Sequence, residues 1–231
     1  MLEVCVDSVQ AAVLACSSGA QRIELSDYLN LGGITPSDAL MAEVRKAVSV
    51  PLIVLVRSRP GNFEFSDIEV ERMIDQSKQA MRLGADGIAI GGLLPGGALD
   101  EGFLRSVAET LPDCELVVHR AFDSVRDPEQ AIETLIELGF RRILTSGGPP
   151  LAMEGLSAIK QWNVWAGDQI EFLPAGGVQP SNAKEILTKS GCYQLHGSFR
   201  SPLAVNSNGL PDPSAIERTR RILEEYLLDH R

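Results

Sequence analysis

Basic residues, cysteines and long apolar runs are scarce in this sequence, and each shortage narrows what the chain can do. Lys and Arg together number 21 against 31 Asp and Glu, so the formal net charge is −10. Nucleic acids and anionic membrane surfaces are bound through basic patches, so we expect neither as a main partner. The four cysteines are widely spaced without a CxxC pair. We therefore expect free thiols in a cytoplasmic chain and no disulfide framework.

No apolar run approaches the ~18 residues that a membrane-spanning helix requires. At the start of the chain, Glu3 interrupts the apolar residues, and no basic segment precedes an apolar one. We therefore expect neither a membrane anchor nor a signal peptide.

What the sequence does contain is enough apolar material for a large core. Hydrophobic residues make up 44% and charged residues 23%, which is the composition of a folded chain and not of a disordered one. A length of 231 residues is common for a single α/β barrel.

Eight short apolar or alternating segments recur along the chain and predict eight β-strands. They cover residues 2–6, 21–25, 51–56, 84–90, 114–118, 142–145, 169–173 and 192–196. Helical patterns follow each of them, the sixth over residues 152–162 and the last over 214–228. No change of composition marks a linker, so we predict an α/β fold, a (β/α)₈ TIM barrel, as a single domain over residues 1–231. A doubly wound open sheet is the alternative, but the first strand lacks the G-x-G-x-x-G turn that this fold often uses.

Alternation predicts which side chains of the first two strands face the barrel interior. If the valines of the first strand pack outward on helices, Glu3 and Cys5 point inward. The same pattern turns Arg22 and Glu24 inward. Acidic side chains from two strands would then face one interior, where Glu3 and Glu24 either pair with arginines as scaffold or act as a base.

The most informative stretch is HRAFD at residues 119–123, which follows a buried apolar strand directly. His119, Arg120 and Asp123 are ionisable, and charge placed at the end of a buried strand is costly unless it is paired or used. A structural ion pair between Arg120 and Asp123 beside a core histidine explains the stretch equally well. Asp127 and Pro128 then predict a helix start.

Other unusual residues also fall at carboxyl ends of the predicted strands, which form the functional face of such barrels. Arg57 directly follows an apolar strand and favours an anion clamp over a solvated basic loop. The turns after strands six, seven and eight are rich in glycine, and exposed backbone N–H groups there favour a phosphate-like anion. Glycines at tight turns can also be purely structural.

These patterns assign roles to individual residues. The predicted catalytic residues are Glu24, His119 and Asp123, and His119 or His196 is an acid–base group near neutral pH if the two converge on one ligand. The predicted substrate- or anion-binding residues are Arg57, Arg120, Ser146, Gly147, Gly148, Gly176, Gly177, His196 and Ser198.

Several motifs closely resemble the copper homeostasis protein CutC family and together cover nearly the whole chain. They are EVCVDS at 3–8, RIEL at 22–25, GGITPS at 32–37, HRAFD at 119–123, LTSGG at 144–148, GV at 177–178 and HGS at 196–198. The resemblance implies a cytosolic barrel that forms a homo-oligomer and handles and binds copper, with copper as its cofactor. No enzyme activity is firmly attached to the family.

The chain departs from the family pattern at several positions. Ser26 stands where the family usually carries a cysteine, Ser58 replaces the proline of Arg-Pro-Arg, and Asn62 and Phe65 replace an acid and a tyrosine. Copper(I) selects thiolate, thioether or imidazole ligands. With serine at position 26, a copper site needs Cys5 together with His119 or His196.

Three functions therefore remain open at the level of sequence. The first is a copper-binding homeostasis protein, and the second is a barrel enzyme that acts on a small anionic or phosphorylated substrate by acid–base chemistry. The third is a ligand-binding or scaffold protein without catalysis. In each case the expected partner is a small molecule or a metal ion.

Overall fold

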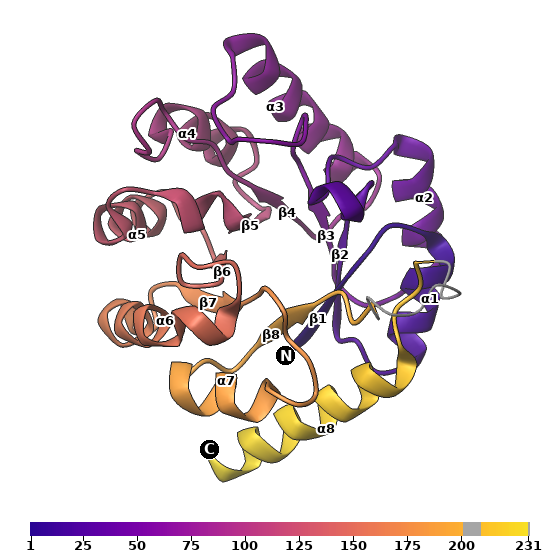
Figure 1. Ribbon diagram of the computed structural model, residues 1–231. Coiled ribbons are helices and arrows are strands. Elements are labelled where there is room, and N and C mark those ends of the chain that lie inside the picture. The colour runs from indigo at the N-terminus through magenta and orange to yellow at the C-terminus, as the bar shows by residue number, and fades with distance from the viewer. Residues whose placement is uncertain (201–208, 231) are drawn as a thin grey trace.

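Eight parallel strands and eight α-helices alternate along residues 1–200 and 209–230, the part of the chain that the computed structural model describes (Figure 1). The strands are β1 (Leu2–Val6), β2 (Arg22–Leu25), β3 (Leu52–Leu55), β4 (Gly87–Ile90), β5 (Glu115–Val118), β6 (Arg142–Thr145), β7 (Glu171–Pro174) and β8 (Leu195–Gly197). The helices are α1 (Val9–Ser17), α2 (Asp38–Ala47), α3 (Asp67–Arg82), α4 (Glu101–Thr110), α5 (Pro128–Glu137), α6 (Ala152–Ala166), α7 (Ala183–Ser190) and α8 (Pro213–Asp229).

The strands form one parallel sheet with the order β7-β6-β5-β4-β3-β2-β1-β8. Its two end strands, β7 and β8, contact each other, so the sheet is a nearly closed barrel inside a ring of helices (Figure 1). The predicted (β/α)₈ TIM barrel is confirmed. No helix in residues 1–200 and 209–230 is both long and apolar enough to cross a membrane.

Short polar side chains cap the starts of four of the helices, among them the helix start predicted at Asp127 and Pro128. Ser8, Ser37, Asp100 and Asp127 each accept a backbone N–H of the first turn with the side chain, which pairs one of the N–H groups that a helix start leaves free. Pro128 occupies the first turn of α5, where its missing N–H costs nothing.

The bounds of β8 and α6 differ from the sequence-based expectation, and two short 3₁₀ helices are additional. β8 begins at Leu195 instead of residue 192, because hydrogen-bonded register with β1 starts where Leu195 meets Leu2. Cys192 belongs to the outer core beneath the helices. Helix α6 continues to Ala166, four residues beyond the predicted end, and two 3₁₀ helices, η1 (Leu29–Leu31) and η2 (Arg120–Ser124), were not anticipated.

The barrel interior is apolar on one side and polar on the other. Strands β3 to β7 fill it with a separate hydrophobic cluster that consists of Ile53, Leu55, Ala89, Val117, Leu144, Leu173 and Ala175. Strands β1, β2 and β8 place polar side chains in the interior, all of them buried: Glu3, Cys5, Arg22, Glu24 and His196. Backbone register sets Cys5 opposite Glu24, and Glu3 opposite both Arg22 and His196.

A chain of buried and half-buried charges closes the amino end of the barrel. Arg22 forms an ion pair with Glu3 and donates to the Gln194 side chain over 3.1 Å. Gln194 donates to Glu171 over 2.6 Å, and Arg142 pairs with both Glu171 and Glu115. Each charge has a partner of opposite sign, which is the condition for keeping charges away from water.

Candidate functional site

A cavity of about 430 Å³ opens at the carboxyl end of the barrel. Side chains of the strands form its floor, and the loops that follow β2, β3, β5, β7 and β8 form its walls. Nine of the predicted site residues line it: Cys5, Glu24, Arg57, His119, Arg120, Gly176, Gly177, His196 and Ser198. The structure thus brings both histidines to one cavity. Asp123, Ser146, Gly147 and Gly148 lie outside its lining.

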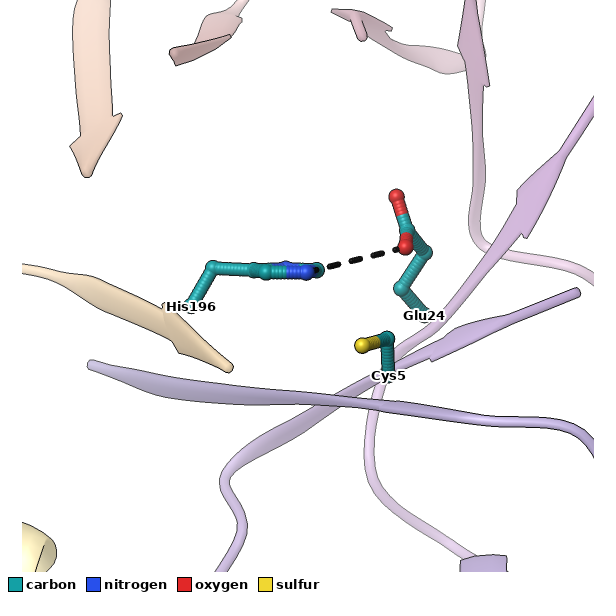
Figure 2. Close-up of side chains that lie close together, drawn as sticks. All are labelled: Cys5, Glu24 and His196. Carbon is teal, nitrogen blue, oxygen red and sulfur yellow. Dashed lines mark ion pairs between the residues drawn. The ribbon is translucent and has the colours of Figure 1, made fainter. Parts of the chain in front are cut away.

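Three potential metal ligands converge on the floor of this cavity. The side chains of Cys5, Glu24 and His196 come from β1, β2 and β8, and their ligand atoms all lie within 4.8 Å of one another (Figure 2). All three side chains are buried. The convergence follows from strand register, since Cys5 and Glu24 are direct neighbours and β8 pairs with the other edge of β1.

His196 lies between two carboxylates. Its Nδ1 is 2.7 Å from Oε1 of Glu3, and its Nε2 is 3.8 Å from Oε2 of Glu24. Burial opposes a charge on the ring, but Cys5 and Glu24 nearby and the hydrogen bond to Glu3 raise the pKa of His196 well above its usual value. The imidazole is therefore held in place from one side and offers its other nitrogen to the cavity floor.

The two carboxylates that flank His196 differ in character. Burial raises the pKa of Glu24, and the nearby charge of Glu3 adds to that effect, while His196 opposes it. Burial also opposes ionisation of Glu3, but Arg22 and His196 outweigh it and hold the pKa of Glu3 well below its usual range. Glu3 is thus a fixed anion, and Glu24 is a buried carboxyl group that can gain or lose a proton near neutral pH.

His119 occupies a different wall and is a neutral imidazole. It is the N-cap residue of η2, and its Nδ1 accepts the backbone N–H of Ala121 over 3.1 Å. Burial lowers the pKa of His119 to about 3, with help from the positive charge of Arg57. Since Nδ1 accepts, the proton resides on Nε2, and that N–H is buried without a hydrogen-bond partner among the described residues.

Arg57 contacts the cavity but also holds its loops. Its two terminal nitrogens donate to the carbonyls of Gly32, Gly33 and Gly61 over 2.7–3.2 Å, and its guanidinium lies 4.7 Å from the centre of the Phe63 ring. Within the described residues no carboxylate lies within 4.0 Å of it, and its Nε has no partner. The positive charge is thus not neutralised by a neighbouring acid.

Asp123 organises the loop after β6 from outside the cavity. It forms an ion pair with Arg120 over 2.7 Å and accepts the backbone N–H of Ser146 over 2.9 Å. It also accepts the hydroxyls of Thr145 and Ser146. The sequence pattern had left a structural ion pair open for this stretch, and the observed contacts are of that kind.

Comparison with known proteins decides the family. The CutC family model matches residues 1–201 of this chain. The chain belongs to the CutC family. A human copper homeostasis protein cutC homolog is 42% identical over 201 residues, which covers 87% of this chain and 74% of the relative. A CutC family protein of Xylella fastidiosa is 38% identical over 208 residues, which covers 90% of this chain and 78% of that protein.

Solved structures agree with the family and the fold. A crystal structure of a copper homeostasis protein CutC from Streptococcus agalactiae superposes with a TM-score of 0.82 at 29% identity, covering 86% of this chain and 98% of that one. Thiamine phosphate pyrophosphorylase of Pyrococcus furiosus gives a TM-score of 0.65 at 17% identity, covering 98% of this chain and 96% of that one. The second likeness shows the barrel fold alone.

The donor atoms on the cavity floor fit copper. A thiolate and an imidazole are ligands that copper(I) accepts, and Glu24 adds a carboxylate beside them. Ser26 is fully buried outside the cavity lining, and its hydroxyl has no partner among the described residues. The soft donors on the cavity floor are therefore Cys5 and His196.

Sequence reasoning missed the contact between Glu3 and His196 and two side chains of the cavity wall, Phe63 and Arg200. Arg200 follows β8 and forms an ion pair with Asp7, which directly follows β1. Arg200 lies four residues after His196, just beyond the carboxyl end of β8. This position could have predicted that Arg200 lines the functional face of the barrel. Nothing in the local sequence marks Phe63 or pairs Glu3 with a residue 193 positions away.

Proposed function

We propose that this chain binds copper(I) at Cys5, Glu24 and His196 and acts in copper homeostasis. The observation that carries the proposal is the convergence of three buried ligand atoms within 4.8 Å on the cavity floor. Membership of the CutC family supports copper as the metal, since curated relatives carry copper homeostasis in their names. Cys5 supplies the thiolate, and His196 supplies the imidazole through Nε2 because Glu3 occupies Nδ1.

The test is an anaerobic copper(I) titration against a competing chelator, run on the wild type, Cys5→Ser and Cys16→Ser. We expect stoichiometric binding by the wild type and by Cys16→Ser, whose altered residue lies on α1 outside the cavity. Cys5→Ser should bind at least ~10-fold more weakly, the scale of losing one interaction of about 1.4 kcal/mol. Equal binding by all three proteins would rule out copper chemistry at Cys5.

A second candidate function is acid–base catalysis on a small anionic or phosphorylated substrate. The cavity of about 430 Å³ is large enough for a metabolite, and the charge of Arg57 has no acidic partner among the described residues. Arg57, Arg120, Gly176, Gly177 and Ser198 would bind the anion, with Glu24 or His119 as the proton-transfer group. Asp123, Ser146, Gly147 and Gly148 would support the loop that carries this site.

Inorganic phosphate is the probe for this second function. Arg57→Ala should weaken phosphate binding by about 1.5–3 kcal/mol, the contribution of a hydrogen bond to a charged group. Arg59→Ala is the matched control, since Arg59 pairs with Glu69 and does not line the cavity. Isothermal titration calorimetry should separate the two variants, and identical affinities would argue against an anion site at Arg57.

We also propose that the chain is a cytoplasmic homo-oligomer, as its family resemblance implies. All four cysteines are free thiols, which suits a reducing compartment. The exposed apolar side chains of Val164 and Trp165 at the end of α6 are suited to a contact with a second copy. Light scattering of Val164→Asp at several protein concentrations should give a smaller assembly than the wild type.

A further inference from the structure

The floor of the cavity holds a second chemical arrangement that involves a residue the copper proposal does not use as a ligand. Glu3 and Cys5 are two positions apart on β1, so both side chains face the barrel interior. His196 lies opposite Glu3 in the register of β1 and β8. Its ring therefore has Glu3 at Nδ1 and Glu24 3.8 Å from Nε2, and Sγ of Cys5 lies within 4.8 Å of a ring nitrogen.

The order of these groups is that of a nucleophile, a base and a residue that orients the base. Nδ1 of His196 is 2.7 Å from Oε1 of Glu3. Nε2 is therefore the ring nitrogen that remains to exchange a proton with the thiol of Cys5. Glu3 cannot turn away, because its other oxygen is paired with the buried side chain of Arg22. Cys5 Sγ lies within 4.8 Å of the ligand nitrogen of His196 and lines an open cavity (Figure 2).

We infer that Cys5, His196 and Glu3 form a nucleophilic triad that transfers acyl groups from small esters or thioesters. Sγ of Cys5 attacks the carbonyl carbon with its proton held on Nε2 of His196, whose ring also shares a proton with Glu3 through Nδ1. The bond from that carbon to the leaving oxygen or sulfur breaks, and the leaving group takes the proton from Nε2. Water then attacks the thioester on Cys5, His196 accepts and returns the proton, and a carboxylic acid departs from the restored thiol.

The other cysteines are natural internal controls. Cys16, Cys114 and Cys192 do not line the cavity, and no histidine forms a hydrogen bond with any of them among the described residues. Cys16 and Cys114 are less buried than Cys5, so simple accessibility favours them over Cys5. Preferential reaction at Cys5 would therefore report activation by its neighbours.

The experiment uses metal-free protein and p-nitrophenyl acetate. We expect a burst of one p-nitrophenol per chain, with the acetyl group on Cys5 in the peptide map and little on Cys16. His196→Gln should slow the burst by ~10²-fold or more, the usual contribution of a general base. Cys16→Ser should keep the wild-type burst, and Cys5→Ser should lose it.

Glu3 is a positioning residue in this scheme and needs its own readout. Glu3→Gln should slow the burst by ~10–100-fold, as loss of an orienting partner does. The burst rate should keep its dependence on ester concentration, since Glu3 does not line the cavity. A folded Glu3→Gln protein with a wild-type burst would remove Glu3 from the triad.

Acetyl groups spread equally over Cys5 and Cys16, or a burst that survives Cys5→Ser, would overturn the triad. Labelling of the wild type decides this even if a variant fails to fold.

Failure of the triad is also distinguishable from failure of the copper proposal. Copper binding without a burst would contradict only the triad, and a burst without copper binding would contradict only the metal site. If both hold, copper(I) should suppress the burst, because one sulfur cannot serve both.

Discussion

His119 illustrates at the scale of one residue how burial makes protonation costly. Its pKa is about 3 in the folded chain and near 6.5 in the unfolded chain. Between these two pH values the unfolded chain binds a proton at His119 and the folded chain does not. The contribution of the neutral ring to the free energy of unfolding is therefore complete above pH 6.5 and decreases as the pH falls.

We therefore predict a pH-dependent loss of stability that His119→Gln removes. The free energy of unfolding of the wild type should fall by about 1.4 kcal/mol per pH unit below pH 6 from this residue alone. His119→Gln should lack this component, so the difference between the two proteins should shrink as pH falls. Urea denaturation at pH 7, 6 and 5 measures it. Parallel curves for both proteins would mean that His119 has the same pKa in the folded and the unfolded chain.

Asp123 is the second residue whose contacts lead to a prediction. Asp123→Asn removes the charge that pairs with Arg120 and weakens the bonds to Thr145 and Ser146. We expect the free energy of unfolding to fall by about 1–3 kcal/mol. Asp113→Asn is the control, since Asp113 is exposed and should change stability by less than about 0.5 kcal/mol. Urea denaturation of both variants should show this difference.

At the scale of elements, one helix is packed unusually closely against a loop. A side-chain carbon on Gly155 of α6 would lie 1.9 Å from the carbonyl oxygen of Ser146 and 2.7 Å from Cα of Gly147. These are backbone atoms, which cannot move aside cheaply. The close approach fixes the loop after β6 against the start of α6.

Gly155→Ala should therefore destabilise the protein by about 3 kcal/mol, the upper end of the usual cost of overpacking. Gly102→Ala is the matched control in α4, because a carbon there meets nothing closer than 3.8 Å. It should leave stability unchanged or raise it by up to about 1 kcal/mol, as alanine favours helix. Thermal unfolding of both variants provides the comparison, and equal melting temperatures would contradict it.

The elements also show how much the sequence could predict. Periodicity and capping residues located the eight strands and the eight α-helices and turned Cys5 and Glu24 inward, because these signals are local. The start of β8 and the contact between Glu3 and His196 depend on how the last strand meets the first. No local pattern carries that information. The site role of Asp123, Ser146, Gly147 and Gly148 remains a prediction, since they lie beside the cavity and not in its lining.

At the scale of the whole molecule, the charges at the amino end join strands across the barrel. Arg142 contacts Glu115 of β5 and Glu171 of β7, and its side chain is 5% exposed. Its neighbour Arg141 also pairs with Glu171, but its side chain is 57% exposed. The two adjacent arginines thus differ mainly in burial.

Arg142→Leu should lower the free energy of unfolding by about 1–3 kcal/mol, because Glu115 and Glu171 lose their hydrogen bonds to a buried guanidinium. Arg141→Leu should cost about 0–1 kcal/mol, as exposed ion pairs do. Urea denaturation in low and high salt checks both values, and added salt should affect the Arg141 pair more. Similar losses for both variants would mean that the Arg142 network is open to water.

The origin of the three converging side chains in β1, β2 and β8 has a consequence for biosynthesis. Glu3 and His196, which meet in the finished barrel, are 193 positions apart, so the ribosome must release nearly the whole chain before they can touch. A nascent chain that has emerged only through β7 exposes the Cys5 thiol without its histidine. Any site that needs Cys5 and His196 together can therefore form only after translation is nearly complete and the barrel has closed.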